Sequence, residues 1–232
     1  MAKLFSPENP IINFLGRITD IMILNVLTLL LCVPVITAGA AITANFYCCL
    51  KIRRDEDSGI LKMYFRSFKE NFRQSTVLFF IILIIMLIPS YLLYVVQSMY
   101  VDTVPTYIRI MLSAAVLLAA FLTVMIFPVQ SRFSNTIGNT IKTSILLAFS
   151  NPFRTLLILL LMVAPAYITY NFLVLLPAYI LFGVSLPAFI AVLLYNKAFL
   201  KMEKAANEAM GIPEPGSEDE HIFEDRDDSN SR

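Results

Sequence analysis

The amino-acid sequence predicts an all-α fold, a polytopic transmembrane helical bundle of about five spans, and three observations support this prediction. Four long stretches contain no charged residue, namely 21–50, 74–101, 110–131 and 155–196. Hydrophobic residues make up 58% of the chain and the mean hydropathy is +0.73, which is too apolar for a soluble domain. An apolar run of about 18 or more residues can cross a bilayer, and the last stretch is long enough for two spans.

The spans are expected near 19–46, 75–99, 108–130, 155–174 and 177–196, within a single transmembrane domain of residues 1–210. Lysine and arginine in short loops stay on the cytoplasmic side of a membrane. Basic residues cluster in the loop 51–73, in the loop 131–154 and directly after the last span. Five spans then place the N-terminus outside and the C-terminus in the cytoplasm. The acidic tail 211–232 is expected to be disordered, because it has too few apolar residues to order itself.

Two loops on the basic side have the pattern of amphipathic surface helices. In 60–73, aromatic and leucine residues recur at helical spacing, and four basic residues occupy other faces: Lys62, Arg66, Lys69 and Arg73. A helix of this kind lies on the inner leaflet with its basic side chains near anionic headgroups. The segment 134–149 repeats the pattern with isoleucines every four residues. Packing of these helices on neighbouring helices, instead of on lipid, fits the same pattern and stays open.

The first uncharged stretch is too long for one straight span, because 30 residues of helix measure about 45 Å and the hydrocarbon core about 30 Å. Proline and glycine interrupt it, and polar side chains line it. The candidate site at this break consists of Asn25, Pro34, Thr37, Gly39, Thr43 and Asn45. Many transporters build a binding site from a broken helix with polar side chains. A plain proline kink with interhelical hydrogen bonds, or a re-entrant hairpin, would give the same sequence.

The sequence offers little for catalysis or for binding a metal or cofactor. The only histidine, His221, lies in the acidic tail, which leaves no histidine-based triad or metal cluster. The cysteines Cys32, Cys48 and Cys49 lack a metal-binding spacing and are expected to be buried apolar residues. No ionisable residue lies in the middle of a span, which disfavours proton coupling. We therefore expect no enzyme, no cofactor and no metal. The basic loops are expected to meet the lipid bilayer, not nucleic acid.

Three runs of sequence resemble the bacterial YesL family: DIMILNVLTLLLCVPVITAGAAITANFYCCLKIRRDEDS, MYFRSFKENFRQST and FPVQSRFSNTIGNTIKTSILLAFSNPFRTLLILL. The resemblance implies a small integral protein of the bacterial plasma membrane whose activity is not established. It also implies an association with carbohydrate uptake and utilisation. The family has no accepted catalytic residues, so none is carried over to this chain.

Two functions remain after these exclusions. The first is an accessory or regulatory protein that contacts another membrane complex, a sugar importer on the strength of the resemblance. The second is a transporter of small neutral solutes such as sugars, built around the broken first span. At 26.2 kDa the chain is small for an alternating-access carrier and would need to form a homodimer for that role. The first function is therefore the preferred expectation.

Overall fold

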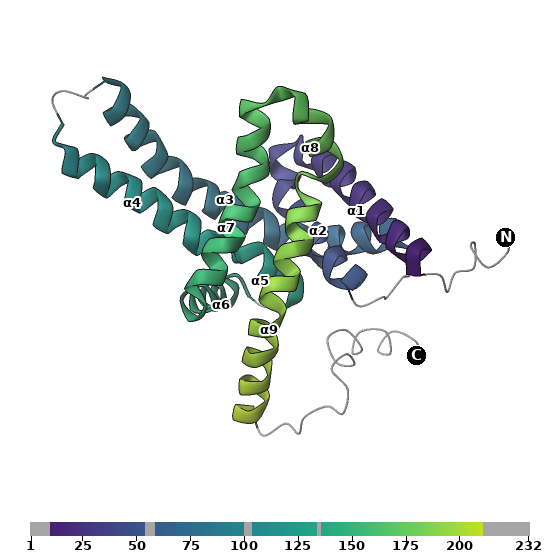
Figure 1. Cartoon of the computed structure of the whole chain (residues 1–232). Coiled ribbons are helices and arrows are strands. Elements are labelled where there is room, and N and C mark those ends of the chain that lie inside the picture. The colour runs from purple at the N-terminus through teal and green to yellow at the C-terminus, as the bar shows by residue number, and fades with distance from the viewer. Residues whose placement is uncertain (1–9, 54–58, 100–103, 134–135, 211–232) are drawn as a thin grey trace. The chain divides into compact units, whose positions relative to one another are not determined.

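The computed structural model describes residues 10–53, 59–99, 104–133 and 136–210, and the elements within these ranges are helices. In chain order they are α1 (Pro10–Cys32), α2 (Val35–Arg53), α3 (Ile60–Met99), α4 (Thr106–Thr123), α5 (Ile126–Arg132), α6 (Ile137–Ser150), α7 (Pro152–Asn171), the short 3-10 helix η2 (Leu173–Leu175), α8 (Leu176–Phe182) and α9 (Ser185–Met210) (Figure 1). The chain forms two compact units, Met1–Leu194 and Tyr195–Arg232. The predicted tail 211–232 lies outside the described residues.

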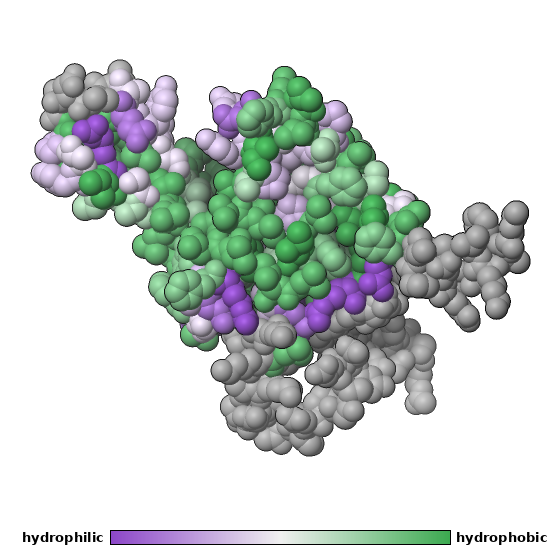
Figure 2. Space-filling model, in the orientation of Figure 1, coloured by the Kyte–Doolittle hydropathy of each residue, from purple (hydrophilic) through white to green (hydrophobic). Residues whose placement is uncertain are grey.

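The helices have the lengths and composition of a multi-pass membrane protein. Five segments are long and apolar enough to cross a membrane: Phe14–Cys32, Val35–Arg53, Ile60–Ser98, Thr106–Arg132 and Pro152–Asn171. Leu173–Phe182 and Ser185–Asn196 qualify together as a broken span with a bend of 56°. Figure 2 shows apolar residues over most of the visible face and hydrophilic residues gathered at its edges. The predicted fold class, an all-α membrane bundle, is confirmed within the described residues.

Residues 19–46, predicted as one span, form parts of two helices, α1 and α2, that fold back on each other (Figure 1). The hydroxyl of Tyr64 demonstrates the reversal, because it lies 3.2 Å from Thr28 Oγ1 and donates to the carbonyl of Ala41 at 3.1 Å. In a straight helix, residues 28 and 41 would lie about 20 Å apart. The segment is therefore a helical hairpin with its turn at residues 33–34.

Local chemistry explains why the chain reverses at this point. Pro34 has no backbone N–H and its ring clashes with the preceding turn, so α1 cannot continue through it. The hydroxyl of Thr37 donates to the carbonyl of Pro34 at 2.7 Å and also to that of Leu31. The backbone N–H of Thr37 donates to the same Pro34 carbonyl at 2.9 Å. The bond to Leu31 occupies a carbonyl that the end of α1 leaves without a helical partner, and the bonds to Pro34 form the start of α2.

The hairpin packs against the first part of α3 through small residues of α2. Gly39 approaches α3 so closely that a Cβ atom there would lie 2.3 Å from the carbonyl oxygen of Ser75 and 2.7 Å from Phe79 Cβ. One turn along, Thr43 Oγ1 lies 2.9 Å from Ser75 Oγ. Small residues at such positions let membrane helices approach backbone to backbone, and hydroxyl pairs then bond across the contact. Gly39 is therefore a helix-contact glycine.

Gly39→Ala should destabilise the protein, because the added methyl group meets backbone atoms that cannot move independently. Overpacking of this kind costs about 1–3 kcal/mol of unfolding free energy. Gly138→Ala is the matched control, since Gly138 is also helical and a Cβ there meets no atom within 4 Å. That change should stabilise α6 by up to about 1 kcal/mol. Equilibrium unfolding in detergent micelles measures both, and similar effects of the two changes would contradict the assigned contact.

The two predicted surface segments differ in how they join the spans that follow. Within the described part of the segment 134–149, a separate helix, α6, begins at Ile137, and Asn151-Pro152 separates it from α7. The segment 60–73 is helical as predicted but continues without a break into the span 75–99, so that α3 has 40 residues. A helix of this length measures about 60 Å, twice the hydrocarbon thickness. The span 75–99 is itself long enough to cross the core, which leaves the charged first part of α3 for the membrane surface.

Candidate functional site

The six residues predicted at the broken helix fall into three separate places. Pro34 and Thr37 form the turn of the α1–α2 hairpin. Gly39 and Thr43 lie in the contact between α2 and α3. Asn25 and Asn45 both contact Ser185, the first residue of α9. The predicted set therefore does not line one site, and only the two asparagines share a partner.

Asn25 closes the break between α8 and α9 with its side-chain amide. Its Oδ1 accepts hydrogen bonds from the backbone N–H groups of Val184 and Ser185, both at 2.7 Å. Its Nδ2 donates to the carbonyls of Tyr179 at 3.0 Å and Ile180 at 2.7 Å. An asparagine amide has two donor hydrogens and two acceptor lone pairs, so these four bonds use its full capacity. The fully buried Asn25 thus holds the end of α8 and the start of α9 together.

Asn45 lies on α2 on the other side of Ser185, and only one of the two polar atoms of its amide has a hydrogen-bond partner. Its Oδ1 accepts from Ser185 Oγ at 2.8 Å, and the thiol of Cys49 lies 3.8 Å from the same oxygen. Its Nδ2 is buried without a hydrogen-bond partner among the described residues. Rotating the amide by 180° would exchange Oδ1 and Nδ2. Nδ2 would then bond to Ser185 Oγ, and Oδ1 would be the atom without a partner. One buried polar atom therefore stays unpartnered, which costs about 1–3 kcal/mol.

Hydroxyl groups extend this polar core into α3. Thr28, one turn after Asn25, lies 3.2 Å from the hydroxyl of Tyr64, and both side chains are fully buried. Tyr64 also donates to Ala41, one turn before Asn45. The core thus joins the hairpin to α3 and to the start of α9. Among the described residues, no group of three histidine, cysteine, aspartate or glutamate side chains could hold a metal ion.

A second polar network, which the sequence did not single out, joins α3, α5 and α6. Gln130 Nε2 donates to Asn71 Oδ1 at 3.2 Å, and Thr140 donates to Gln130 Oε1 at 3.1 Å. Ser144 of α6 donates to the carbonyl of Met125 at 3.4 Å. The signal was present in the sequence, since Gln130 is an amide at the end of a 22-residue uncharged stretch, 110–131. Such side chains usually bond to a neighbouring helix.

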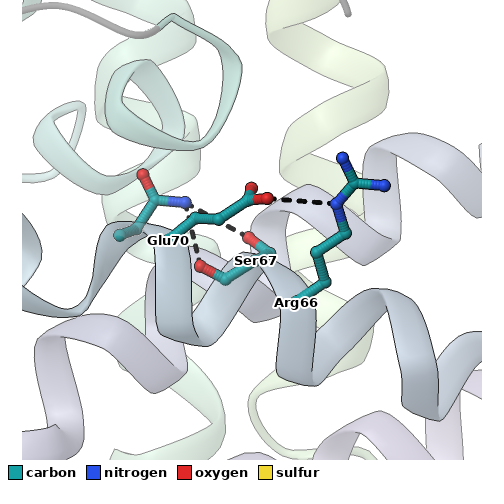
Figure 3. Close-up of polar contacts among 4 residues, drawn as sticks. Arg66, Ser67 and Glu70 are labelled. Atoms are coloured by element: carbon teal, nitrogen blue, oxygen red, sulfur yellow. Dashed lines mark hydrogen bonds and ion pairs between the residues drawn. The ribbon is translucent and has the colours of Figure 1, made fainter. Parts of the chain in front are cut away.

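The four basic residues predicted to meet a membrane surface lie on one exposed surface of α3: Lys62, Arg66, Lys69 and Arg73. The other side of the same segment is buried, including Met63, Tyr64 and Ser67. Arg66 Nε donates to Glu70 Oε1 at 3.0 Å along the exposed side (Figure 3). Asn71 Nδ2 donates to the carbonyl of Ser67 at 3.0 Å beside this pair (Figure 3).

The comparisons with known proteins cover the part of the chain that contains these features. No curated protein and no solved structure matches the chain significantly. Residues 21–93 match the model of a family described as a protein of unknown function, DUF624. The matched residues comprise α1 from Ile21, all of α2 and α3 as far as Leu93, and they include both asparagines and the four basic residues. Over this part, the chain is similar to the DUF624 family.

Proposed function

We propose that the protein is a YesL-like accessory or regulatory membrane protein that acts by contact with a carbohydrate-import complex. The bonding of Asn25 carries this proposal. In transporters with discontinuous helices, the freed backbone groups at the break bind substrate and ions. Here Asn25 occupies two N–H groups and two carbonyls at the break between α8 and α9. The four backbone groups that Asn25 bonds to at the broken span are thus satisfied without a solute.

The apolar faces of α3 and α4 supply a surface for such a contact. These two helices lie side by side (Figure 1). Their outward side chains are large and more than half exposed, among them Leu87, Ile88, Met111, Leu117 and Leu118. In a membrane, faces of this kind meet either lipid or the spans of another protein. The resemblance to a family associated with carbohydrate uptake supports a sugar importer as the protein whose spans contact this surface.

Three measurements test the accessory function. Deleting the gene should lower sugar import by cells, while the purified protein alone in proteoliposomes should transport no oligosaccharide above the level of empty vesicles. A photo-crosslinking residue in place of Met111, which is 69% exposed, should capture a subunit of the importer. The same residue in place of the fully buried Leu24 is the control and should capture none. Solute uptake by the protein alone would overturn the proposal.

The second candidate function, transport of a small neutral solute, rests on a different observation. Asn45 Nδ2 is a buried donor without a partner, and the same amide bonds to Ser185 at the start of α9. The break before Ser185 bends the span by 56°. A hydroxyl of a sugar is an acceptor that such an amide would bind. Under this function, uptake in proteoliposomes should be present, should require a homodimer and should be lost on Asn45→Ala.

A further inference from the structure

The charged first part of α3 presents three distinct sides. One side packs against the hairpin through residues that are at most 8% exposed, namely Met63, Tyr64, Ser67, Ser75 and Leu78. A second side exposes large apolar side chains, with Leu61 51%, Phe65 42% and Phe72 36% exposed. A third side carries the exposed basic residues. The two alternatives raised by the sequence, packing on protein and contact with lipid, are therefore compatible, because they involve different sides of one helix.

The angular order of these sides is that of a helix at a membrane interface. Successive residues of an α-helix are rotated by about 100°, so the centre of the basic side lies about 90° from the centre of the exposed apolar side. Glu70 lies about 160° from that apolar side by the same rule. With Phe65 and Phe72 directed at acyl chains, the basic side chains lie at the level of the headgroups. Glu70 then points into water.

We propose that residues 60–73 form a binding site for the headgroups of anionic phospholipids. Lys62, Lys69 and Arg73 supply the positive charge, and Arg66 shares its charge with Glu70 through the 3.0 Å ion pair (Figure 3). Basic residues beside a membrane attract anionic lipids in this way. A soluble anion would explain the basic side but not the exposed phenylalanines beside it. The site is independent of the accessory function, since it requires no partner protein.

The absence of tryptophan from the sequence permits a direct test on the full chain. Phe65→Trp places a single indole on the exposed apolar side, in vesicles that contain brominated phosphatidylglycerol or brominated phosphatidylcholine at equal mole fraction. Brominated phosphatidylglycerol should quench this indole with an apparent affinity at least about threefold higher, a preference that added salt reduces. Tyr94→Trp is the control on the same helix. Tyr94 is 67% exposed and no charged residue lies nearby in the sequence, so the two lipids should quench there equally.

Two variants with opposite expected effects complete the test. The triple change Lys62→Gln, Lys69→Gln and Arg73→Gln should abolish the preference, while Glu70→Gln should increase it by removing a negative charge from beside the basic side. All four side chains are exposed, so the buried side of α3 is unchanged. Equal quenching by the two lipids at Phe65→Trp, or a preference insensitive to these variants, would overturn the proposal. Loss of the preference on adding soluble glycerol phosphate would also overturn it, by assigning the basic side to a soluble anion.

Discussion

Asn25→Ala is expected to lower the free energy of unfolding by about 2–6 kcal/mol, because four hydrogen bonds to the backbone at the break between α8 and α9 are lost. The lower value takes about 0.6 kcal/mol for each hydrogen bond, as measured between membrane helices. The upper value takes about 1.5 kcal/mol for each bond, as in soluble proteins. Water cannot replace the lost amide in the interior of a bundle, so the N–H groups of Val184 and Ser185 stay unsatisfied, whereas the carbonyl of Tyr179 still accepts from the N–H of Gly183.

Asn45→Ala is the matched control for this prediction. Both changes remove the same atoms from a fully buried asparagine, so the cost of the cavity is similar. Asn45 accepts one hydrogen bond from Ser185 and a weak one from the thiol of Cys49, and it buries an unpartnered nitrogen, so its loss should change stability by less than about 1.5 kcal/mol. Unfolding by sodium dodecyl sulfate, followed by circular dichroism, measures both variants. Faster hydrogen exchange at the amides of Val184 and Ser185 should accompany Asn25→Ala alone. Equal losses in the two variants would refute the bracing role of Asn25.

Both termini are expected on the same side of the membrane, contrary to the orientation that the sequence predicted. A hairpin returns the chain to the side from which it entered, so α1 and α2 together make no net crossing. The basic loops still predict that the start of α3 and the end of the last span lie in the cytoplasm. The remaining crossings are α3, α4 with α5, α7, and α8 with α9. Reporter fusions to the two ends should both give the cytoplasmic signal, and opposite signals would contradict the hairpin.

The depth of the hairpin is expected to be less than a full crossing. Thr76 Oγ1 donates to the carbonyl of Ile36 at 3.1 Å, which places the turn of the hairpin only three residues beyond the exposed Arg73. The rest of α3, about 23 residues or about 34 Å, is sufficient to cross the hydrocarbon core beyond this point. Val33→Cys, in a chain whose native cysteines are alanine, should therefore resist a membrane-impermeant thiol reagent applied from outside. Rapid labelling would show that the hairpin crosses the membrane completely.

The sequence predicted where the chain is apolar but not where it reverses direction. The uncharged stretches located α3, α4, α7 and the last span, because charge is costly inside a bilayer wherever the helix lies. A proline such as Pro34 gives the same sequence signal whether the helix bends slightly or folds back. What distinguishes the two is the contact of Tyr64 with both Thr28 and Ala41, which lies outside the predicted span.

For the candidate site, residue type indicated which polar side chains are buried, but not which groups they bond to. Asn25 and Asn45 stood out as amides in an apolar stretch, and both are fully buried in polar contacts. Their shared partner Ser185 did not stand out, because a single serine in an apolar run is common in membrane helices. The basic residues of 60–73 are exposed, and their contact with a membrane surface stays a prediction. That the same helix also packs on α2 depends on the fold of the hairpin.

The hydrogen bonds of Asn25 can form only late in the synthesis of the chain. Its acceptor contact with Ser185 joins residues that are 160 positions apart in the chain. At a translation rate of about 5–20 residues per second, the hairpin waits about 8–32 s for this partner to be made. During that interval the amide of Asn25 has to find temporary partners in the translocation machinery, in water or in the nascent bundle. The first part of the chain to enter the membrane is therefore among the last to reach its final structure.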